Sequence, residues 1–369
     1  MPDRTEECHV AILGAGPIGC AIAYSVARRK IPAVVLEWEG PGGSRMTSGR
    51  FRVPPDADAP YAHLCRRGIE QYPALEAEIG SIGYVRSGGL VPVLRETDSH
   101  EGTARTRQQA EAGLDVRWLS REEAIGMEPS LSPEILGAAY SPYDGSVNPD
   151  LLVRRLVNAA RRVGGAFLFH CGHLTVRPRS GDFLIRSGLG EIQANHVVLA
   201  AGVDDPDIRR QLEISLPLHR VGDLMLVTEP VAPVLRHTLP AAFQSVSGEV
   251  VLEGPASDGI ALEPIRAVAR DARHLLPSLA AARVIRAWAG PRSVPADGRP
   301  ILGTVGDNTY VAIAREEITL CLLLGEATAE IITRRRASSE IEMFSPARFS
   351  ATTAAAAGGD VREDSGRTT

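Results

Sequence analysis

Residues 10–19 read VAILGAGPIG, a helical pattern follows, and residues 33–37 read AVVLE. This order predicts a buried strand, a glycine turn, a helix and a second strand that ends at an acid. Gly14 would permit the tight turn, Gly16 would let a pyrophosphate approach the backbone, and Gly19 would let helix and strand pack closely. The helix N-terminus would then face the phosphates, and Glu37 would accept hydrogen bonds from a ribose diol.

A GxGxxG pattern alone is weak evidence, because a glycine-rich turn in an ordinary α/β protein has the same letters. In this chain the strand, the helix and the acid stand where a dinucleotide site needs them. The stretch therefore favours dinucleotide binding, but it does not separate NAD from FAD.

Length and composition are those of an ordinary globular protein. The 369 residues are 44% hydrophobic with a net charge of -5, enough for one large or two medium domains. The absence of a basic excess argues against nucleic acid as a partner. The polar, acidic residues 1–7 do not resemble a secretory signal, and apolar runs such as 318–324 are too short to span a membrane. Five scattered cysteines without a CxxC pair predict a reducing cytoplasm and no metal site.

The rest of the chain alternates between two kinds of pattern. Residues 148–164 predict a helix, with Asn148 as the capping residue, proline at its first position and Gly164 at its end. A further helix is expected around 61–79 and another around 101–112, and β-rich stretches cover 166–199 and 218–251. Parallel-type and antiparallel-type stretches alternate, which predicts two domains through which the chain passes more than once.

Three later segments accompany the first motif in a fixed order. Residues 194–202 read ANHVVLAAG, residues 287–292 read AWAGPR and residues 297–303 read DGRPILG. This arrangement resembles flavoproteins of the D-amino-acid-oxidase-like superfamily, and the resemblance extends over residues 10–334. Residues 87–90, 137–149 and 226–230 are similar to the branch that comprises the β-subunits of opine oxidases and D-hydroxyproline dehydrogenases. Glycine, sarcosine and D-amino-acid oxidases are relatives.

The resemblance implies an α/β fold, in which a Rossmann-type FAD-binding domain is interleaved with an antiparallel-sheet α+β substrate domain. The FAD-binding domain would comprise residues 1–80, 145–215 and 288–337. The substrate domain would comprise residues 81–144 and 216–287. Residues 345–369, which include a small, polar, glycine-rich tail, are expected to be disordered.

The resemblance also implies a set of site residues. The cofactor-binding residues would be Gly14, Gly16, Gly19, Glu37, Ser44, Arg45, Thr175, Val176, Ala201, Gly202, Gly290, Gly303, Ile318 and Thr319. Arg292 matches the arginine that holds the substrate carboxylate in amino-acid-oxidising relatives, a task that suits a guanidinium fork. For five of these residues a purely structural role is the alternative. Ser44 and Arg45 would then lie in a solvated loop, Thr175 and Val176 in an ordinary strand, and Arg292 in a surface or inter-domain ion pair.

The function implied is oxidation of the C–N bond of a small amino or imino acid, by hydride transfer to flavin N5. The imine formed would be hydrolysed by water, and no protein group would serve as a catalytic base. Partner subunits are implied, since the β-subunits of this branch work in hetero-oligomers. The alternatives are a self-contained glycine or D-amino-acid oxidase, and a flavin-binding subunit with little or no turnover of its own.

The chain departs from the family pattern at residues 314–317, which read AREE. The family has a Gly-His pair, a small residue and glycine before the Thr-Leu that opens its last helix. Backbone amides at that helix start stabilise negative charge on reduced flavin, and glycines there allow close approach. Glu316 and Glu317 add bulk and potential negative charge, so we expect a higher cost of flavin reduction unless they turn away or Arg315 compensates.

Overall fold

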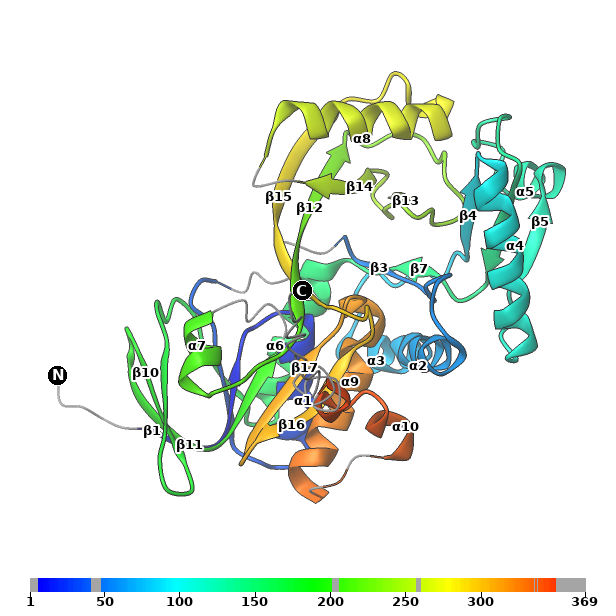
Figure 1. Ribbon diagram of the computed structural model, residues 1–369. Coiled ribbons are helices and arrows are strands. Elements are labelled where there is room, and N and C mark those ends of the chain that lie inside the picture. Colours follow the sequence, from blue (N-terminus) through cyan, green and yellow to red (C-terminus); the bar gives the residue numbers. More distant parts are fainter. Residues whose placement is uncertain are drawn as a thin grey trace, which may run out of the picture.

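A computed structural model describes residues 6–40, 48–200, 206–256, 260–334, 336 and 338–349 of the chain. Two bodies are visible in Figure 1, one built around a large sheet and one around two smaller sheets. The chain crosses between them several times. Four strands run through the region where the bodies meet: β3 (Arg50–Phe51), β7 (Gly145–Ser146), and the long strands β12 (Leu218–Thr228) and β15 (Val284–Pro295).

The opening motif forms the predicted strand, turn, helix and strand. β1 (Glu6–Leu13) leads into α1 (Pro17–Arg28), and β2 (Ala33–Leu36) lies parallel to β1. Helix α1 begins with Gly16 as its N-cap and Pro17 in its first turn, where the proline's missing N–H has no intrahelical partner to lose. These elements confirm the order of strand, turn, helix and second strand predicted for residues 10–37.

The large sheet has the strand order β16-β17-β11-β1-β2-β8, and the β9–β10 hairpin joins it through β11. Strands β8, β2, β1, β11 and β17 are parallel, whereas β16 is antiparallel at the edge. The other strands of this sheet are β8 (Ala166–Leu168), β9 (Thr175–Pro178), β10 (Phe183–Ser187), β11 (Gly190–Ala200), β16 (Ile301–Gly306) and β17 (Thr309–Ile313).

Side-chain alternation along β1 divides the core into two layers. Val10 and Ile12 pack in a cluster that contains much of α1 and the buried faces of the neighbouring helices. Ala11 and Leu13 point the other way, into a cluster that the β9–β10 hairpin and α7 cover. The helices of this body are α2 (Ala59–Ile69), α3 (Tyr72–Ile79), α6 (Pro149–Arg162), α7 (Pro206–Gln211), α9 (Glu317–Arg334) and α10 (Ser339–Glu342).

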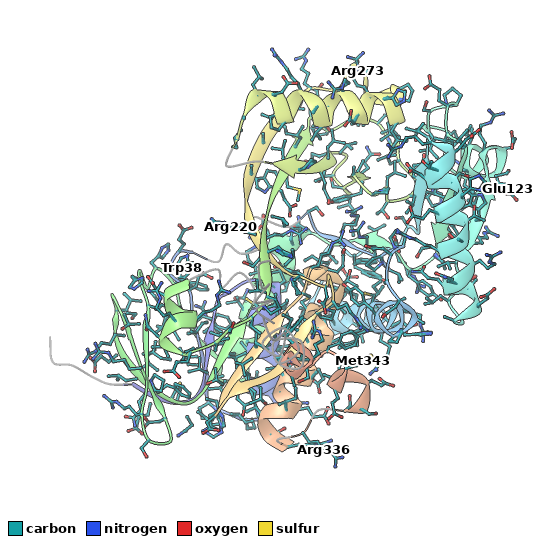
Figure 2. All side chains as sticks on the ribbon, in the orientation of Figure 1. Trp38, Glu123, Arg220, Arg273, Arg336 and Met343 are labelled. Carbon is teal, nitrogen blue, oxygen red and sulfur yellow. The ribbon has the colours of Figure 1, made fainter. Side chains whose placement is uncertain are left out.

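The second body consists of two antiparallel sheets with helices outside them. One sheet has the order β13-β14-β12-β15, and the other has the order β4-β6-β5. Helix α8 covers the first, and Arg273 on its outer side points away from the sheet (Figure 2). The strands are β4 (Gly89–Val93), β5 (Arg117–Ser120), β6 (Gly137–Ser141), β12 (Leu218–Thr228), β13 (Ala242–Gln244), β14 (Val250–Ala256) and β15 (Val284–Pro295). The helices are α4 (Glu96–Glu111), α5 (Arg121–Met127) and α8 (Leu262–Leu275).

Some expected elements differ in detail. The helix expected around residues 61–79 is two helices, since Pro73 lies in the first turn of α3 and cannot donate the hydrogen bond that would continue α2. The helix after Asn148 is confirmed, and the Asn148 side chain accepts a hydrogen bond of 3.0 Å from the Leu151 amide. Residues 350–369, most of the expected tail, lie outside the described residues. The α/β fold with an antiparallel second sheet system is confirmed, and the domain boundaries stay a prediction.

Candidate active site

The glycine turn between β1 and α1 has the geometry of a phosphate cradle. Gly14 has a φ of +106°, in the region that favours glycine. A Cβ added to Gly19 would lie 2.0 Å from the Gly14 carbonyl oxygen, so only glycine lets the helix start this close to the turn. The N-cap Gly16 has no side chain, and no capping side chain covers the first turn of α1. Backbone amides at this helix start are therefore available to an anion.

Glu37 lies at the end of β2 beside this turn. Its Oε2 accepts a hydrogen bond of 2.8 Å from the Ala15 amide, which ties the acid to the glycine loop. A carboxylate has about four acceptor positions, so this bond leaves capacity for two hydroxyl groups. The placement agrees with the role expected for Glu37, which stays a prediction.

The β13-β14-β12-β15 sheet has one apolar and one polar face. Leu224 and Leu226 of β12, with Val250 and Leu252 of β14, belong to the apolar cluster that also contains Val268 of α8. The residues between them point to the opposite face, because successive side chains of a strand alternate. That second face carries Asp223, Met225, Glu253, Gly290 and Arg292.

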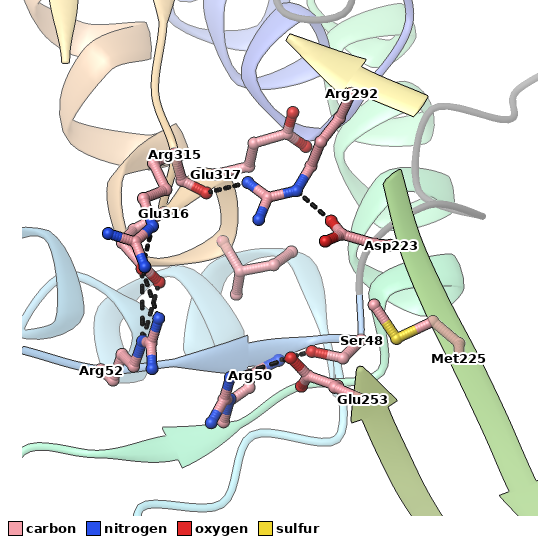
Figure 3. A pocket seen from close by; sticks show the side chains of 11 residues that line it. Ser48, Arg50, Arg52, Asp223, Met225, Glu253, Arg292, Arg315, Glu316 and Glu317 are labelled. Atoms are coloured by element: carbon pink, nitrogen blue, oxygen red, sulfur yellow. Dashed lines mark hydrogen bonds and ion pairs between the residues drawn. The ribbon is translucent and has the colours of Figure 1, made fainter. Parts of the chain in front are cut away.

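A pocket lies between this polar face and the first body, next to the start of α9 (Figure 3). Its lining is unusually rich in charge, with four arginines and four acids. The lining residues are Ser48, Arg50, Arg52, Asp223, Met225, Glu253, Arg292, Arg315, Glu316, Glu317 and Ile318. The chain segments that meet here are the residues around β3, strands β12, β14 and β15, and the first residues of α9.

Arg292 extends from β15 into this pocket (Figure 3). Its Nε donates a hydrogen bond to Asp223, which lies diagonally across the β12–β15 pair, since Val221 is the residue opposite Arg292. Its Nη1 donates a bond of 3.0 Å to the Arg315 carbonyl oxygen. Among the residues that the structure describes, two of the five N–H groups of the guanidinium have partners, which leaves the other donors for a ligand.

Arg52 and Glu316 form a second ion pair on the opposite wall (Figure 3). Nη2 of Arg52 lies 2.8 Å from Oε1 of Glu316, and Nε lies 3.2 Å from both carboxylate oxygens. Burial by itself would raise the pKa of Glu316, but the Arg52 charge and hydrogen bonds outweigh it and lower the pKa to about 2. The Glu316 side chain thus points toward Arg52, and its carboxyl group is ionised at neutral pH.

Arg50 joins the two bodies. Its Nη2 lies 2.9 Å from Glu253 on β14, and its Nη1 donates a bond of 2.6 Å to the Leu239 carbonyl oxygen. The side chain is only 8% exposed, and burial lowers the pKa of Arg50 despite the neighbouring Glu253. Asp144 lies close by, where its Oδ1 accepts bonds from the Val53 amide and the Ser141 hydroxyl at 3.1 and 2.7 Å.

Glu317 differs from the other pocket acids. It is the first residue of α9, and its carboxyl group lies near Arg292 (Figure 3). Within the described part of the chain, its side chain has no hydrogen bond or ion-pair partner. Burial raises the pKa of Glu317 to about 7; Asp223 contributes in the same direction, whereas Arg292 opposes the rise.

The remaining predicted site residues are distributed over the site and its surroundings. Ile318 lines the pocket, and Gly290 lies opposite Asp223 on the polar sheet face. The Thr319 hydroxyl accepts a 3.0 Å bond from the Arg52 amide, so it holds the chain around β3 against α9. Gly303 has a φ of +144° and packs against a turn, because an added Cβ would lie 3.0 Å from Cδ of Pro346.

Thr175 and Val176 lie in β9, a position that their alternative role as ordinary strand residues also predicts. The Val176 amide donates a 2.6 Å bond to Gln211 Oε1, so this donor is already engaged within the protein. The residues Ser44, Arg45, Ala201 and Gly202 lie outside the described residues. Their expected roles, like that of Thr175 and Val176, stay predictions.

Sequence reasoning missed Arg50, Arg52, Asp223 and Glu253 as pocket residues. Residues 50–52 read RFR, in which two arginines flank a buried phenylalanine. This pattern does not by itself predict a pocket. Asp223 and Glu253 alternate with apolar residues on β12 and β14, a pattern equally typical of a solvent-facing side. Only the packing of the two bodies shows that this side faces a pocket.

Comparison with known proteins places this geometry in context. The profile of the DAO family, described as FAD dependent oxidoreductase, matches residues 9–331. Glycine oxidase from Geobacillus kaustophilus is 27% identical, over 93% of this chain and 98% of the relative. A subunit of opine oxidase from Agrobacterium tumefaciens is 25% identical, over 94% of this chain and 98% of the relative.

Similarity extends to solved structures. The crystal structure of glycine oxidase from Geobacillus kaustophilus superposes with a TM-score of 0.86 and 25% identity, and the match covers 92% of this chain and 98% of that one. The family resemblance expected from the sequence is therefore confirmed, and a glycine oxidase and an opine oxidase subunit are among the relatives. Among the described residues, no helix is long and apolar enough to cross a membrane.

Proposed function

The chain belongs to the DAO family of FAD-dependent oxidoreductases, and from this premise we propose that it oxidises the C–N bond of a small amino or imino acid. The observation that supports this proposal best is Arg292, a half-buried guanidinium with unused donors at the wall of a polar pocket. The oxidation would yield an imine, which water hydrolyses.

The glycine loop fits the adenosine end of FAD. An added Cβ at Gly19 would clash with the Gly14 carbonyl oxygen, so glycine at this position lets α1 start close to the turn. The uncapped start of α1 offers amides to a pyrophosphate. Glu37 has acceptor capacity for the ribose diol after its bond to Ala15. When bound, FAD supplies the hydride acceptor that the protein itself lacks.

The flavin end of the site is compatible with the departure at residues 314–317. Glu316 is turned into its pair with Arg52 rather than left as an isolated charge, and the raised pKa of Glu317 reduces its negative charge near neutral pH. The expected penalty from two acids at the start of α9 is therefore smaller than their formal charge suggests.

The residues of this chain would act by binding and orientation. The free N–H groups of Arg292 suit a substrate carboxylate, for which charge-assisted hydrogen bonds are the strong choice. Asp223 holds the other edge of the same guanidinium and so limits its rotation. Fixing the reacting atoms in one orientation is worth several kcal/mol in favourable cases.

Two neighbouring functions are distinguished by specific features. Similarity to glycine oxidase favours a self-contained amino-acid oxidase, whereas similarity to an opine oxidase subunit favours one component of a hetero-oligomeric dehydrogenase. The internal pairing of Arg50, Arg52 and Arg292 with acids supports a third candidate, an FAD-binding subunit with little turnover, since a substrate carboxylate must compete with these acids.

Anaerobic absorbance spectroscopy tests the proposal. The purified protein should show flavin bands, and one member of a panel of glycine, sarcosine, prolines, opines and D-amino acids should bleach them. Flavin bands that none of these compounds bleaches would favour the subunit with little turnover. No flavin after reconstitution with FAD would refute the proposal. Reoxidation by oxygen then separates an oxidase from a dehydrogenase that needs a partner.

The variant Arg292→Ala tests the carboxylate site. We expect KM for the substrate to rise about 10- to 100-fold, because a hydrogen bond to a charged group is worth about 1.5–3 kcal/mol, while the bound-flavin spectrum stays unchanged. Arg266→Ala is the matched control, since Arg266 is exposed on α8, which covers the other face of the sheet. Equal kinetic constants in both variants would remove Arg292 from the site.

A further inference from the structure

Glu317 is the pocket acid without a partner among the residues that the structure describes. Asp223, Glu253 and Glu316 are each paired with an arginine, whereas the Glu317 side chain makes neither a hydrogen bond nor an ion pair with any residue the structure describes. Its carboxyl group lies at the pocket wall beside Arg292, on the first turn of α9 (Figure 3). A carboxyl group so placed is available to a ligand.

We propose that Glu317 receives the proton of the substrate's ammonium group before C–N oxidation. This inference rests on the proposed function and differs from the expectation from sequence that no protein base takes part. It assigns to this chain a catalytic residue at a position where the family pattern has a small residue or glycine.

The reaction requires a free nitrogen lone pair. An amino acid at neutral pH carries an ammonium group, whose lone pair is held in an N–H bond. Transfer of one proton from R–NH₃⁺ to the Glu317 carboxylate leaves R–NH₂ and a neutral carboxylic acid. FAD, when bound, would supply the acceptor for the Cα–H hydride with its two electrons, and the nitrogen lone pair would form the C=N bond. Charge, protons and electrons balance, with FAD of the proposed function as the oxidant.

The arrangement of charges matches an amino-acid zwitterion. The free N–H groups of Arg292 offer a site for the carboxylate, and Glu317 offers an acceptor for the ammonium group beside it. Asp223 is a weaker candidate for the base, since its charge is already held by the Arg292 Nε–H. Protonation of Glu317 also removes a negative charge from the start of α9 at the moment when flavin accepts electrons.

The surroundings of Glu317 determine its titration. Several charged or titratable groups line the pocket or interact electrostatically with Glu317. They are Arg292 on β15, Asp223 on β12, Glu253 on β14, Arg50 and Arg52 around β3, Arg315 and Glu316 before α9, and Cys321 within α9. Burial and Asp223 raise the pKa of Glu317 to about 7, against the opposing effect of Arg292. Glu317 is therefore ionised, and competent as a base, above neutral pH.

The pH dependence of kcat/KM for anaerobic flavin reduction tests the proposal. In the native protein kcat/KM should rise with pH through a midpoint at about 7 and then level off, because the ionised Glu317 accepts the ammonium proton inside the site. In Glu317→Gln the only reactive form is the free amine from solution. At pH 8 the kcat/KM of Glu317→Gln should be lower than that of the native protein. It should keep rising about tenfold per pH unit until the pH reaches the pKa of the substrate's own ammonium group.

Asp223→Asn tests the neighbouring acid. Because Asp223 orients Arg292, the level of kcat/KM should fall in this variant, and only the shape of its pH profile is compared. The substitution removes the neighbouring acid but leaves Glu317, so the plateau should remain, with its midpoint at lower pH because a charge that raises the pKa of Glu317 is gone. Superimposable pH profiles of the native protein and Glu317→Gln would overturn the proposal. If no compound reduces the flavin at any pH in the native protein, the proposed function itself fails, which is a separate result.

Ligand binding supplies a readout that needs no turnover. We would measure Kd values for 2-aminoisobutyrate, which has an ammonium group but no Cα–H, and for isobutyrate, which lacks the nitrogen. Glu317→Gln should weaken binding of 2-aminoisobutyrate at pH 8 by roughly tenfold, the size of a charge-assisted hydrogen bond, and should not weaken binding of isobutyrate. Equal losses for both ligands would show a general distortion of the pocket and would contradict the assignment.

Discussion

The Arg52–Glu316 pair offers the sharpest test of the electrostatics of the pocket. The perturbation is Glu316→Gln, which keeps the shape of the side chain and removes its charge. Glu316 is 9% exposed and Arg52 is 17% exposed, so the arginine left behind has little access to water. We expect the free energy of unfolding to be lower in this variant at neutral pH, while α9 keeps its position.

The size of this loss follows from the pKa of Glu316. A fall from the ordinary value of 4.5 to about 2 corresponds to roughly 3 kcal/mol of stability at neutral pH. Removal of one partner from a buried pair costs about 3–5 kcal/mol in other proteins, which agrees. Because the folded-state pKa is lowered, this contribution is present above pH 4.5 and is lost as the pH falls toward 2.

Urea denaturation, followed by tryptophan fluorescence at pH 7.5 and at pH 3, measures the difference. Glu70→Gln is the control. Glu70 is 44% exposed and its partner Arg66 is 34% exposed, so this ion pair should contribute less than about 1 kcal/mol to the free energy of unfolding. A loss for Glu316→Gln at pH 7.5 no larger than that for Glu70→Gln would refute the reasoning. So would a loss at pH 3 as large as the loss at pH 7.5.

Two further variants test other parts of the structure. Gly19→Ala should purify without flavin, because its Cβ would lie 2.0 Å from the Gly14 carbonyl oxygen; the ratio of flavin to protein absorbance measures this, and an unchanged ratio would contradict the cradle. Asp144→Asn should gain stability relative to the native protein as the pH rises from 4 to 7, because burial raises the pKa of Asp144 to about 6 and its charge then opposes folding. Parallel melting-temperature curves for the two proteins would show that Asp144 does not titrate in this way.

The sequence by itself determined the elements whose causes are local. The turn from β1 into α1 follows from Gly14 and Gly16, and the start of α6 follows from Asn148 and the proline after it, because turns and helix caps depend on neighbours only a few residues away. The order of motifs along the chain was also sufficient for the family. Arg292 could be predicted as a candidate site residue because its motif is contiguous.

Only the tertiary structure decided the chemistry of the pocket. Asp223 is 69 residues from Arg292, and Glu253 is 203 residues from Arg50, so their pairing depends on strand register and on how the two bodies pack. The same packing turns Glu316 toward Arg52 and leaves Glu317 beside Arg292 without a partner among the described residues. A one-residue shift in strand register would place Asp223 on the opposite face of its sheet. Local sequence patterns cannot contain this information, because the energy of a charge depends on the groups that surround it in space.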